Sequence, residues 1–305
     1  ISQTFDFKYK FFGIKGDGKF TAVYSNYNFF HSLDNKMFTN EVLFFEQSAN
    51  KKDDTFWSEE RPMKLTQEEV NDYKLKDSIQ IIRKSKPFLD SVDRAKNKFK
   101  FSNILFGYTK NNSYKNRSFN ISSPIQAVQF NTVQGWNTNI NLSFVKRNRE
   151  KNTWIRSNAL FDYGFSDEQI RIHGSLAVKF NNFSKPILTI SGGRKLSQFN
   201  EREPITPTIN TISTLFFEDN YAKFFDNTFA TLRFRNEVWN GVVMNSSLSY
   251  QDRKPVFNTT DYTTIDESDD MYTSNNPLNE SDFVNPAIAR HNVFKFDITA
   301  RIRFN

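Results

Sequence analysis

Apolar and polar residues alternate along residues 292–304, at the end of the chain. Every second side chain from Phe294 to Phe304 is apolar, and the positions between them carry Lys, Asp, Thr and Arg. Because successive side chains of a β-strand point to opposite faces, the segment predicts a strand with one apolar and one charged face. A strand of this length with this pattern is typical of a barrel that spans a membrane, apolar outside and wet inside.

The same alternation recurs over residues 169–180, so it is a property of the chain rather than of one segment. The alternation assigns each side chain of both strands to one of two faces. The predicted lipid-facing residues are Ile170, Ile172, Leu176, Val178, Phe294, Phe296, Ile298 and Ile302. The predicted lumen-lining residues are Arg171, His173, Lys179, Lys295, Asp297, Arg301 and Arg303, and their basic bias would favour anions in an open lumen.

Strand patterns cover most of the rest of the chain, and several are longer than the five or six residues usual in globular proteins. Short connections alternate with long loops at residues 197–221 and 253–291, as in a barrel with tight turns at one rim. The strand number and barrel closure stay open. Predicted strands are Thr4–Phe12, Gly18–Tyr27, Phe38–Glu46, Phe99–Tyr108, Ala127–Val133, Trp136–Lys146, Trp154–Phe165, Glu168–Phe180, Lys185–Lys195, Asp226–Trp239, Gly241–Asp252 and Asn292–Phe304.

Residues 50–98 have a different character. Thr66 and Glu69 form a capping-box pattern, which predicts a helix from there to about Ser85, stopped by Pro87, with a second short helix after it. Residues 74–100 hold nine Lys or Arg against three Asp, so this helical insert is basic. It is either an ordinary solvated surface or a periplasmic collar near acidic lipid phosphates.

The chain thus divides into opening strands over 1–49, a short basic helical insert over 50–98 that we place in the periplasm, and the main barrel strands over 99–305. The predicted fold class is all-β, an antiparallel transmembrane β-barrel of the outer-membrane type. Because the chain begins at Ile1 without Met or a signal segment, we expect it to be an internal piece of a longer protein.

Composition narrows the function classes. Hydrophobic residues make up 37% of the chain, the mean hydropathy is −0.64, and no apolar run exceeds the four residues Val42–Phe45. This excludes a transmembrane helix, which needs about 20 apolar residues. The 34 Phe and 11 Tyr suit strands and lipid contact. The absence of Cys excludes disulfides and thiol chemistry, and a diffuse net charge of +7 does not argue for nucleic acid.

No catalytic or metal-binding arrangement stands out. His31, His173 and His291 do not have the spacing of metal ligands, and there is no nucleophile elbow, so we expect no enzyme, no cofactor and no metal site. Two weaker patterns keep two interpretations each. Ser191–Arg194 is a turn or bulge at a strand end, or a phosphate cradle. The acidic loop over residues 261–282 is a solvated loop, or a calcium site without a standard ligand spacing.

Three tryptophans, Trp136, Trp154 and Trp239, fall at the ends of predicted strands. In a membrane barrel they would form an interfacial girdle. In a soluble protein they could serve as stacking platforms for glycans.

Three stretches resemble one known family. Phe56–Glu69 resembles its W-x-x-x-R-P-x-x-L-T-x-E-E motif, Asn97–Thr109 its N-K-F and G-Y-T block, and Phe130–Gly135 its F-N-T-V-E-G block, with Gln134 where Glu is usual. The family comprises uncharacterised outer-membrane proteins of Bacteroidota with a carboxypeptidase-like regulatory domain, absent here, before a large barrel. The resemblance implies a location in the bacterial outer membrane and supplies no reaction.

We therefore expect a non-enzymatic outer-membrane β-barrel protein that serves envelope transport or supports a complex in that membrane. Its partners would be outer-membrane lipids and other outer-membrane proteins. Two alternatives stay open: a partner-binding subunit of an outer-membrane assembly or secretion machine, and a soluble all-β module that binds glycans.

Overall fold

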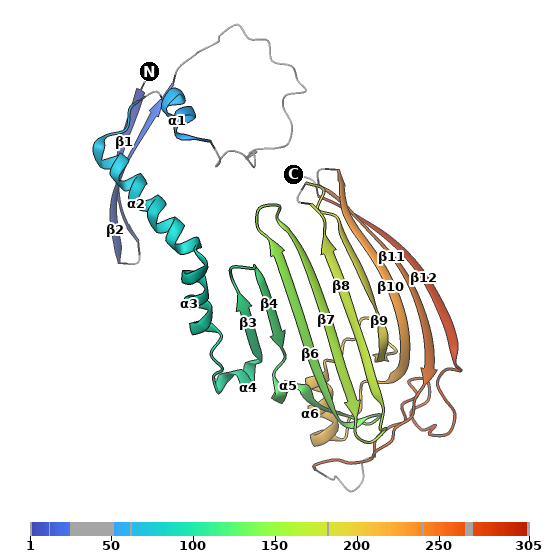
Figure 1. Cartoon of the computed structure of the whole chain (residues 1–305). Coiled ribbons are helices and arrows are strands. Elements are labelled where there is room, and N and C mark those ends of the chain that lie inside the picture. Colours follow the sequence, from blue (N-terminus) through green and yellow to red (C-terminus); the bar gives the residue numbers. More distant parts are fainter. Residues whose placement is uncertain are drawn as a thin grey trace. The chain divides into compact units, whose positions relative to one another are not determined.

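The structure is a computed structural model that describes residues 2–11, 13–24, 52–61, 63–181, 183–239, 241–265 and 271–303. It forms two compact units, Ile1–Gln80 and Ile81–Asn305, which are considered separately (Figure 1). The predicted strand Phe38–Glu46 lies outside the described residues.

The first unit contains an antiparallel hairpin of β1 (Ser2–Phe11) and β2 (Ile14–Val23). The predicted strand Thr4–Phe12 is confirmed over its described residues, whereas the predicted Gly18–Tyr27 overlaps β2 only from Gly18 to Val23, and residues 25–27 lie outside the described residues. Phe5 is paired with Phe20, and their rings lie 6.3 Å apart. Phe5, Phe7 and Tyr9 are exposed on one side of β1, as its alternating sequence predicts. The hairpin therefore has the same two-faced pattern as the longer strands of the second unit.

The helices begin at residues whose side chains cap them. Asp53 accepts a hydrogen bond from the Phe56 N–H at the start of α1 (Asp54–Glu60). At α2 (Gln67–Lys84) the predicted capping box is confirmed: the Thr66 N–H donates to Glu69 at 2.7 Å, and the Glu69 N–H donates to the Thr66 hydroxyl at 3.3 Å. Pro87 lies in the first turn of α3 (Lys86–Lys96), where proline starts a helix rather than interrupting one.

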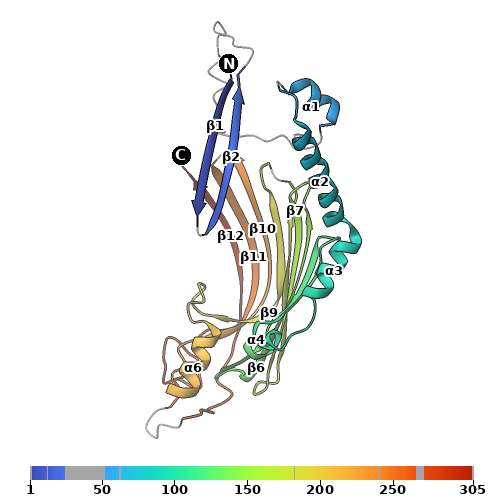
Figure 2. The ribbon, with the colours of Figure 1, turned by 90° about the vertical axis from the view of Figure 1, so that its left-hand side faces the viewer.

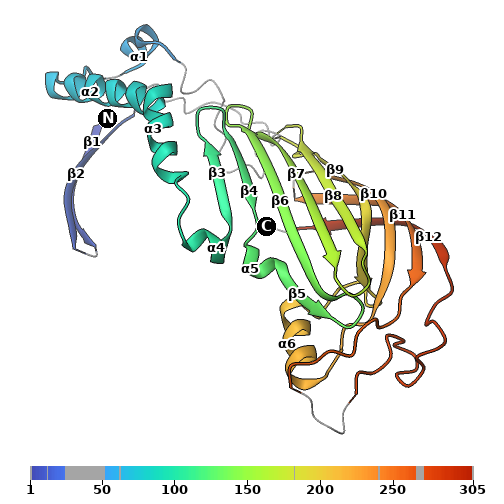
Figure 3. The same ribbon diagram turned by 60° about the horizontal axis from the view of Figure 1, so that its bottom comes forward.

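The second unit is built on one antiparallel sheet of ten strands, which confirms the all-β class. The spatial order is β12-β11-β10-β9-β8-β7-β6-β4-β3, and β5 pairs with part of β6. Among the described residues neither edge strand, β3 or β12, pairs with a further strand, so the curved sheet in Figure 3 is not closed into a barrel. Its strands are β3 (Tyr108–Asn112), β4 (Arg117–Ile121), β5 (Val128–Asn131), β6 (Gly135–Asn148), β7 (Thr153–Gly164), β8 (Ile170–Lys179), β9 (Ile187–Gln198), β10 (Phe224–Trp239), β11 (Val242–Pro255) and β12 (His291–Ile302).

The two long loops lie at the same end of the sheet, as predicted, but the short β7–β8 connection, residues 165–169, lies at that end too. At one end, the short-turn end, brief connections join β3 to β4, β6 to β7, β8 to β9 and β10 to β11. At the other, the long-loop end, lie residues 199–223, residues 256–290 and the segment that carries α5 (Pro124–Ala127). Figures 1 and 2 show α6 (Pro207–Phe217) at this long-loop end, where it packs against β5.

Three segments depart from the sequence prediction. Phe99–Tyr108 is not a strand: α4 (Ser102–Phe106) occupies half of it, and only Tyr108 belongs to β3. Asn103 imposes this, because its side chain accepts from the Lys100 N–H and donates to the Gly107 carbonyl, which holds a helical turn. Helix α6 lies within a predicted loop, capped by the Thr206 hydroxyl, and β4 has no counterpart among the predicted strands.

The small buried core lies at the long-loop end and is mostly polar. Phe130, Val133, Leu215 and Phe225 are its largest apolar members. Around them are buried Thr, Asn and Ser side chains, together with Arg171. In the described part of the second unit no second sheet covers either face of the ten-stranded sheet. Most large apolar side chains of the sheet are therefore exposed. In the described part of the chain, no helix combines the length and the apolar character needed to cross a membrane.

Candidate functional site

The pairing register separates the side chains of the sheet into two faces. Residues paired across neighbouring strands point to the same side, so one row can be followed from strand to strand. A row near the middle of the sheet is apolar from β4 to β12 except at β7, and on β3 it continues with Lys110. Most of its apolar side chains are exposed, Phe296 to 65% and Leu248 to 40%. We call this side the apolar face. The row consists of Phe119, Phe144, Ser157, Leu176, Ile190, Leu232, Leu248 and Phe296.

The opposite side, the polar face, is hydrophilic in the neighbouring row. Each strand of the row contributes a Ser, Thr or Asn, and β12 ends it with a lysine; the Thr231 and Ser249 hydroxyls lie 3.0 Å apart. Short hydroxyl and amide side chains remain hydrated without filling the space above the sheet. The row consists of Thr109, Asn120, Ser143, Asn158, Ser175, Ser191, Thr231, Ser249 and Lys295.

The sequence-derived sets fall on these two faces. All eight residues predicted to face lipid lie on the apolar face: Ile170, Ile172, Leu176, Val178, Phe294, Phe296, Ile298 and Ile302. Of the predicted lumen set, Arg171, His173, Lys179, Lys295, Asp297 and Arg301 lie on the polar face, and Arg303 directly follows β12. Contact with lipid or with a water-filled lumen remains a prediction.

His173, Lys295 and Asp297 share one hollow of about 410 Å³ on the polar face, lined by β8 to β12. Several of its charges are paired: Lys195 contacts Glu203 at 2.7 Å, and Arg253 contacts Glu201 at 3.1 Å. Lys295 also bonds Glu201, and these two hydrogen bonds hold the pKa of that carboxyl below its usual value. These pairs fasten the loop after β9 to β9, β11 and β12.

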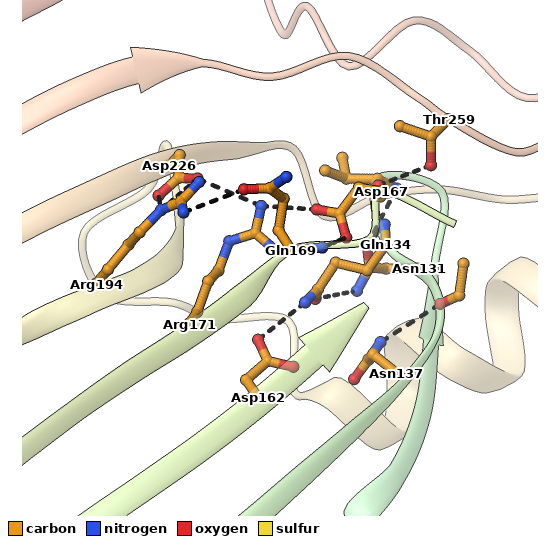
Figure 4. A network of polar contacts seen from close by, with 12 residues as sticks. Asn131, Gln134, Asn137, Asp162, Asp167, Gln169, Arg171, Arg194, Asp226 and Thr259 are labelled. Carbon is orange, nitrogen blue, oxygen red and sulfur yellow. Dashed lines mark hydrogen bonds and ion pairs between the residues drawn. The ribbon is translucent and has the colours of Figure 1, made fainter. Parts of the chain in front are cut away.

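A buried charge network lies at the long-loop end of the sheet (Figure 4). Arg171, only 1% exposed, contacts Asp167 at 2.7 Å and Asp226 at 3.3 Å. Arg194 donates hydrogen bonds from Nε and Nη2 to the Asp226 carboxylate, at 2.5 to 3.0 Å. Arginines from β8 and β9 therefore converge on the Asp226 carboxylate of β10, and Asp167, from the turn before β8, pairs with the first of them.

Gln134 links this region to the β5–β6 turn. Its side-chain amide donates to Asp162 at 2.9 Å and its oxygen accepts from Asn131 (Figure 4). Asn131 also accepts from the Val133 and Gln134 N–H groups, and Gly135 has φ of 64°, so the Phe130–Gly135 motif forms a tight turn. The sequence did not predict this network, because alternation marks a charged position without revealing its partner.

The Asn97–Thr109 motif also has a structural role. The Asn97 side chain bonds the backbone of Asn111, the Tyr108 hydroxyl donates to the Asn97 carbonyl, and Gly107 has φ of 81°. A Cβ at Gly107 would lie 2.6 Å from the Ile121 carbonyl oxygen, which explains the glycine. The motif therefore holds the C-terminal end of α3 against β3.

Ser191–Arg194 lies inside β9 rather than at a strand end, so that part of its prediction is wrong. Gly193 has φ of 131°, and a Cβ there would lie 2.2 Å from the Ile172 carbonyl oxygen. Helix α6 begins only at Pro207, so the segment is not followed by the helix N-terminus that a phosphate cradle uses. The glycine instead permits close approach of β8.

The tryptophans divide between the faces. Trp136 and Trp239 lie on the apolar face at opposite ends of the sheet, as a girdle requires. Trp154 lies on the polar face opposite Lys179, with the Arg156 guanidinium 4.2 Å from its ring centre.

The acidic loop shows no cation site in its described part. No three His, Asp or Glu side chains among the described residues come close enough to hold a metal ion. Asp282 instead accepts hydrogen bonds from the Val284 and Asn285 N–H groups, which is an ordinary turn role. Asp266, Glu267, Asp269 and Asp270 lie outside the described residues.

Residues 102–305 match the C-terminal domain of the family of unknown function DUF5686. No curated protein and no solved structure matches the chain.

Proposed function

Given that the chain belongs to the DUF5686 family, we propose that it is a non-enzymatic β-barrel protein of the bacterial outer membrane. Its role would be envelope transport or structural support of a complex in that membrane. The observation that supports this most is the exposed apolar face, which continues across the strands from β4 to β12. Contiguous exposed apolar surfaces of this extent mark membrane or protein contact.

The height of the apolar face suits a bilayer. On β12 it runs from Phe294 to Ile302, about 27 Å along the strand and about 20 Å when tilted by 40°. The apolar band of outer-membrane barrels is roughly 25 Å tall. A soluble sandwich would need a second sheet over this face, and the described residues of the second unit form only one.

The two ends of the sheet suggest an orientation. Bacterial barrels usually have short periplasmic turns and long extracellular loops. The insert ends in α3, whose Asp93 bonds Ser113 in the short β3–β4 turn, so this rule favours the periplasmic placement expected for the insert at its C-terminal end. We propose that the short-turn end faces the periplasm.

Membrane fractionation of the expressed chain, followed by single-channel conductance of detergent-extracted material, tests this function. We expect partitioning into the outer membrane. Discrete conductance steps would indicate an open pore and transport, whereas their absence would indicate a plugged or scaffolding barrel. Recovery in the soluble fraction without detergent would refute the membrane assignment and favour the glycan-binding alternative.

The outer edge of β12 supports a second candidate, a partner-binding subunit of an outer-membrane assembly. Among the described strands it has no neighbour on that side, and an unpaired edge is a template for another chain. Stoichiometric co-purification of another outer-membrane protein in mild detergent would favour this candidate, and a monodisperse single species would oppose it.

A further inference from the structure

Basic side chains gather on the polar face toward the short-turn end. The register places Lys179 opposite Trp154 on one side and Ile187 on the other, and Ile187 opposite Arg235. The next row of the polar face, two residues along each strand, contains Arg233. It pairs with Thr189, which pairs with Ala177, which in turn pairs with Arg156. These residues form what we call the basic belt. It consists of Arg147, Arg156, Lys179, Arg233, Arg235, Arg301 and Arg303.

Few acidic groups oppose the basic belt. Glu237 lies on the same face of β10, but Lys185 already contacts it at 2.7 Å. Asp297 lies in the same row as Arg233, because Ser247 of β11 pairs with both residues. The Ser247 hydroxyl donates to the Asp297 carboxylate at 3.4 Å. The belt therefore carries an excess of positive charge even when both carboxylates are counted.

The belt differs from the other charged regions of the sheet because its guanidinium groups are not paired with carboxylates. Arg147, Arg156, Arg233, Arg235, Arg301 and Arg303 form no ion pair with any described residue, and all are exposed. In the buried network, and at Lys195, Arg253 and Lys295 of the hollow, carboxylates by contrast neutralise the bases. Arg233 belongs to the belt and also lines the hollow. Five such arginines on one face, with Arg303 directly after β12, would repel one another unless anions lie between them.

We propose that the basic belt binds multivalent oxyanions, meaning several linked phosphate or sulfate groups. The binding proposal depends on the proposed function in one respect only: if the sheet forms a barrel, the basic belt lies at the mouth of that barrel. Planar guanidinium groups bind phosphate oxygens with two parallel hydrogen bonds. Arg233 and Arg235 are about 7 Å apart along β10, and Lys179 and Arg235 are separated by about two strand spacings, or 10 Å. Such spacing fits a linked series of charges better than a single ion.

Trp154 provides a signal for binding, because its ring lies against Arg156 within the belt. The full chain in neutral detergent would be titrated with tripolyphosphate at constant ionic strength while tryptophan fluorescence is followed. We expect a saturable change that Trp154→Phe removes. In parallel, mixed micelles containing phosphatidic acid would show whether the oxyanions belong to a soluble ligand or to a lipid headgroup; saturation by either probe supports the site.

A matched pair of double variants tests the location. Arg233→Gln with Arg235→Gln removes two charges from the polar face and should weaken binding by about tenfold or more, because each loses charge-assisted hydrogen bonds. The control variant combines Arg117→Gln with Lys146→Gln. These two residues lie opposite each other on β4 and β6, at the same end of the sheet but on the apolar face, so their replacement should leave binding unchanged.

Equal weakening by both double variants, or no saturable change with either probe, would overturn the proposal. That result would leave the membrane assignment untouched, because fractionation does not depend on the belt. Conversely, a chain recovered in the soluble fraction would refute the membrane assignment, and the same titration could still be made.

Discussion

The side-chain amide of Asn97 bonds both backbone groups of Asn111, accepting from its N–H and donating to its carbonyl, each at 2.8 Å. Asn97 thereby takes the place of a neighbouring strand at the outer edge of β3. Asp93 lies in helix α3, which ends just before Asn97, and its carboxylate accepts hydrogen bonds from the Ser113 N–H and hydroxyl at 2.6 and 2.7 Å. Helix α3 therefore covers this edge of the sheet, one of the ways in which proteins prevent further strands from pairing.

Replacing Asn97 by Ala should expose that edge. Two backbone groups lose their partners, so we expect a loss of about 1–3 kcal/mol in unfolding free energy and increased self-association. Urea unfolding in detergent and light scattering would measure the two effects. Lys96→Ala, at an exposed position of the same helix, should change stability by less than about 0.5 kcal/mol. Equal behaviour of the two variants would contradict the edge role.

Phe296 and Thr299 test the assignment of the two faces. Phe296→Arg places a charge on the apolar face and should cost about 2–4 kcal/mol near the bilayer midplane. Thr299→Arg places the same charge on the polar face, opposite Asn245, and should cost little. Folding free energies in lipid vesicles would compare them. If both variants fold equally well in the bilayer, the apolar face does not meet lipid.

Arg171 should be needed for stability at the long-loop end. Its removal in Arg171→Met leaves the buried Asp167 carboxylate without its ion pair, and we expect a cost of about 3–5 kcal/mol. Asp226 keeps Arg194 as a partner in that variant. Adding Asp167→Asn should restore part of the loss, so that the double variant is more stable than the sum of the single effects by at least about 1 kcal/mol. Strict additivity in urea unfolding would exclude the coupling.

Lys223 should make stability depend on pH. It lies before β10, bonded to Asn220 and Thr273, and burial lowers its pKa from 10.5 to about 8 although Glu280 opposes the shift. Between these values the unfolded chain binds more protons, so stability rises with pH, by about 2 kcal/mol from pH 7.5 to 9.5.

Thermal unfolding in detergent over this pH range measures the effect, and Lys223→Met should abolish the rise. The range stops below pH 10 because burial raises the pKa of Tyr272 to about 12. Above pH 10 the unfolded chain loses that tyrosine proton first, and stability falls again. Parallel curves for the wild-type chain and Lys223→Met would show that the lysine is not responsible.

The two faces of the long strands follow from the amino-acid sequence alone. A strand has a side-chain period of two, so alternation at Phe294, Phe296 and Ile298 assigns each position to a face without any knowledge of its neighbours. The capping box at Thr66 and Glu69 is equally readable, because its hydrogen bonds join residues three apart. Both signals are local.

The residues that meet across the sheet are set by the tertiary fold and cannot be read from the sequence. Asp226 and Arg171 are 55 residues apart, and the basic belt depends on the register of strands from β6 to β12. The error at Phe99–Tyr108 is partly local: its aromatic composition suits a strand, but Asn103 bonds Lys100 and Gly107 and turns the chain. Its long-range part is Asn97, which occupies the edge of β3. Alternation carries no information on pairing, since a strand presents the same two faces to any neighbour.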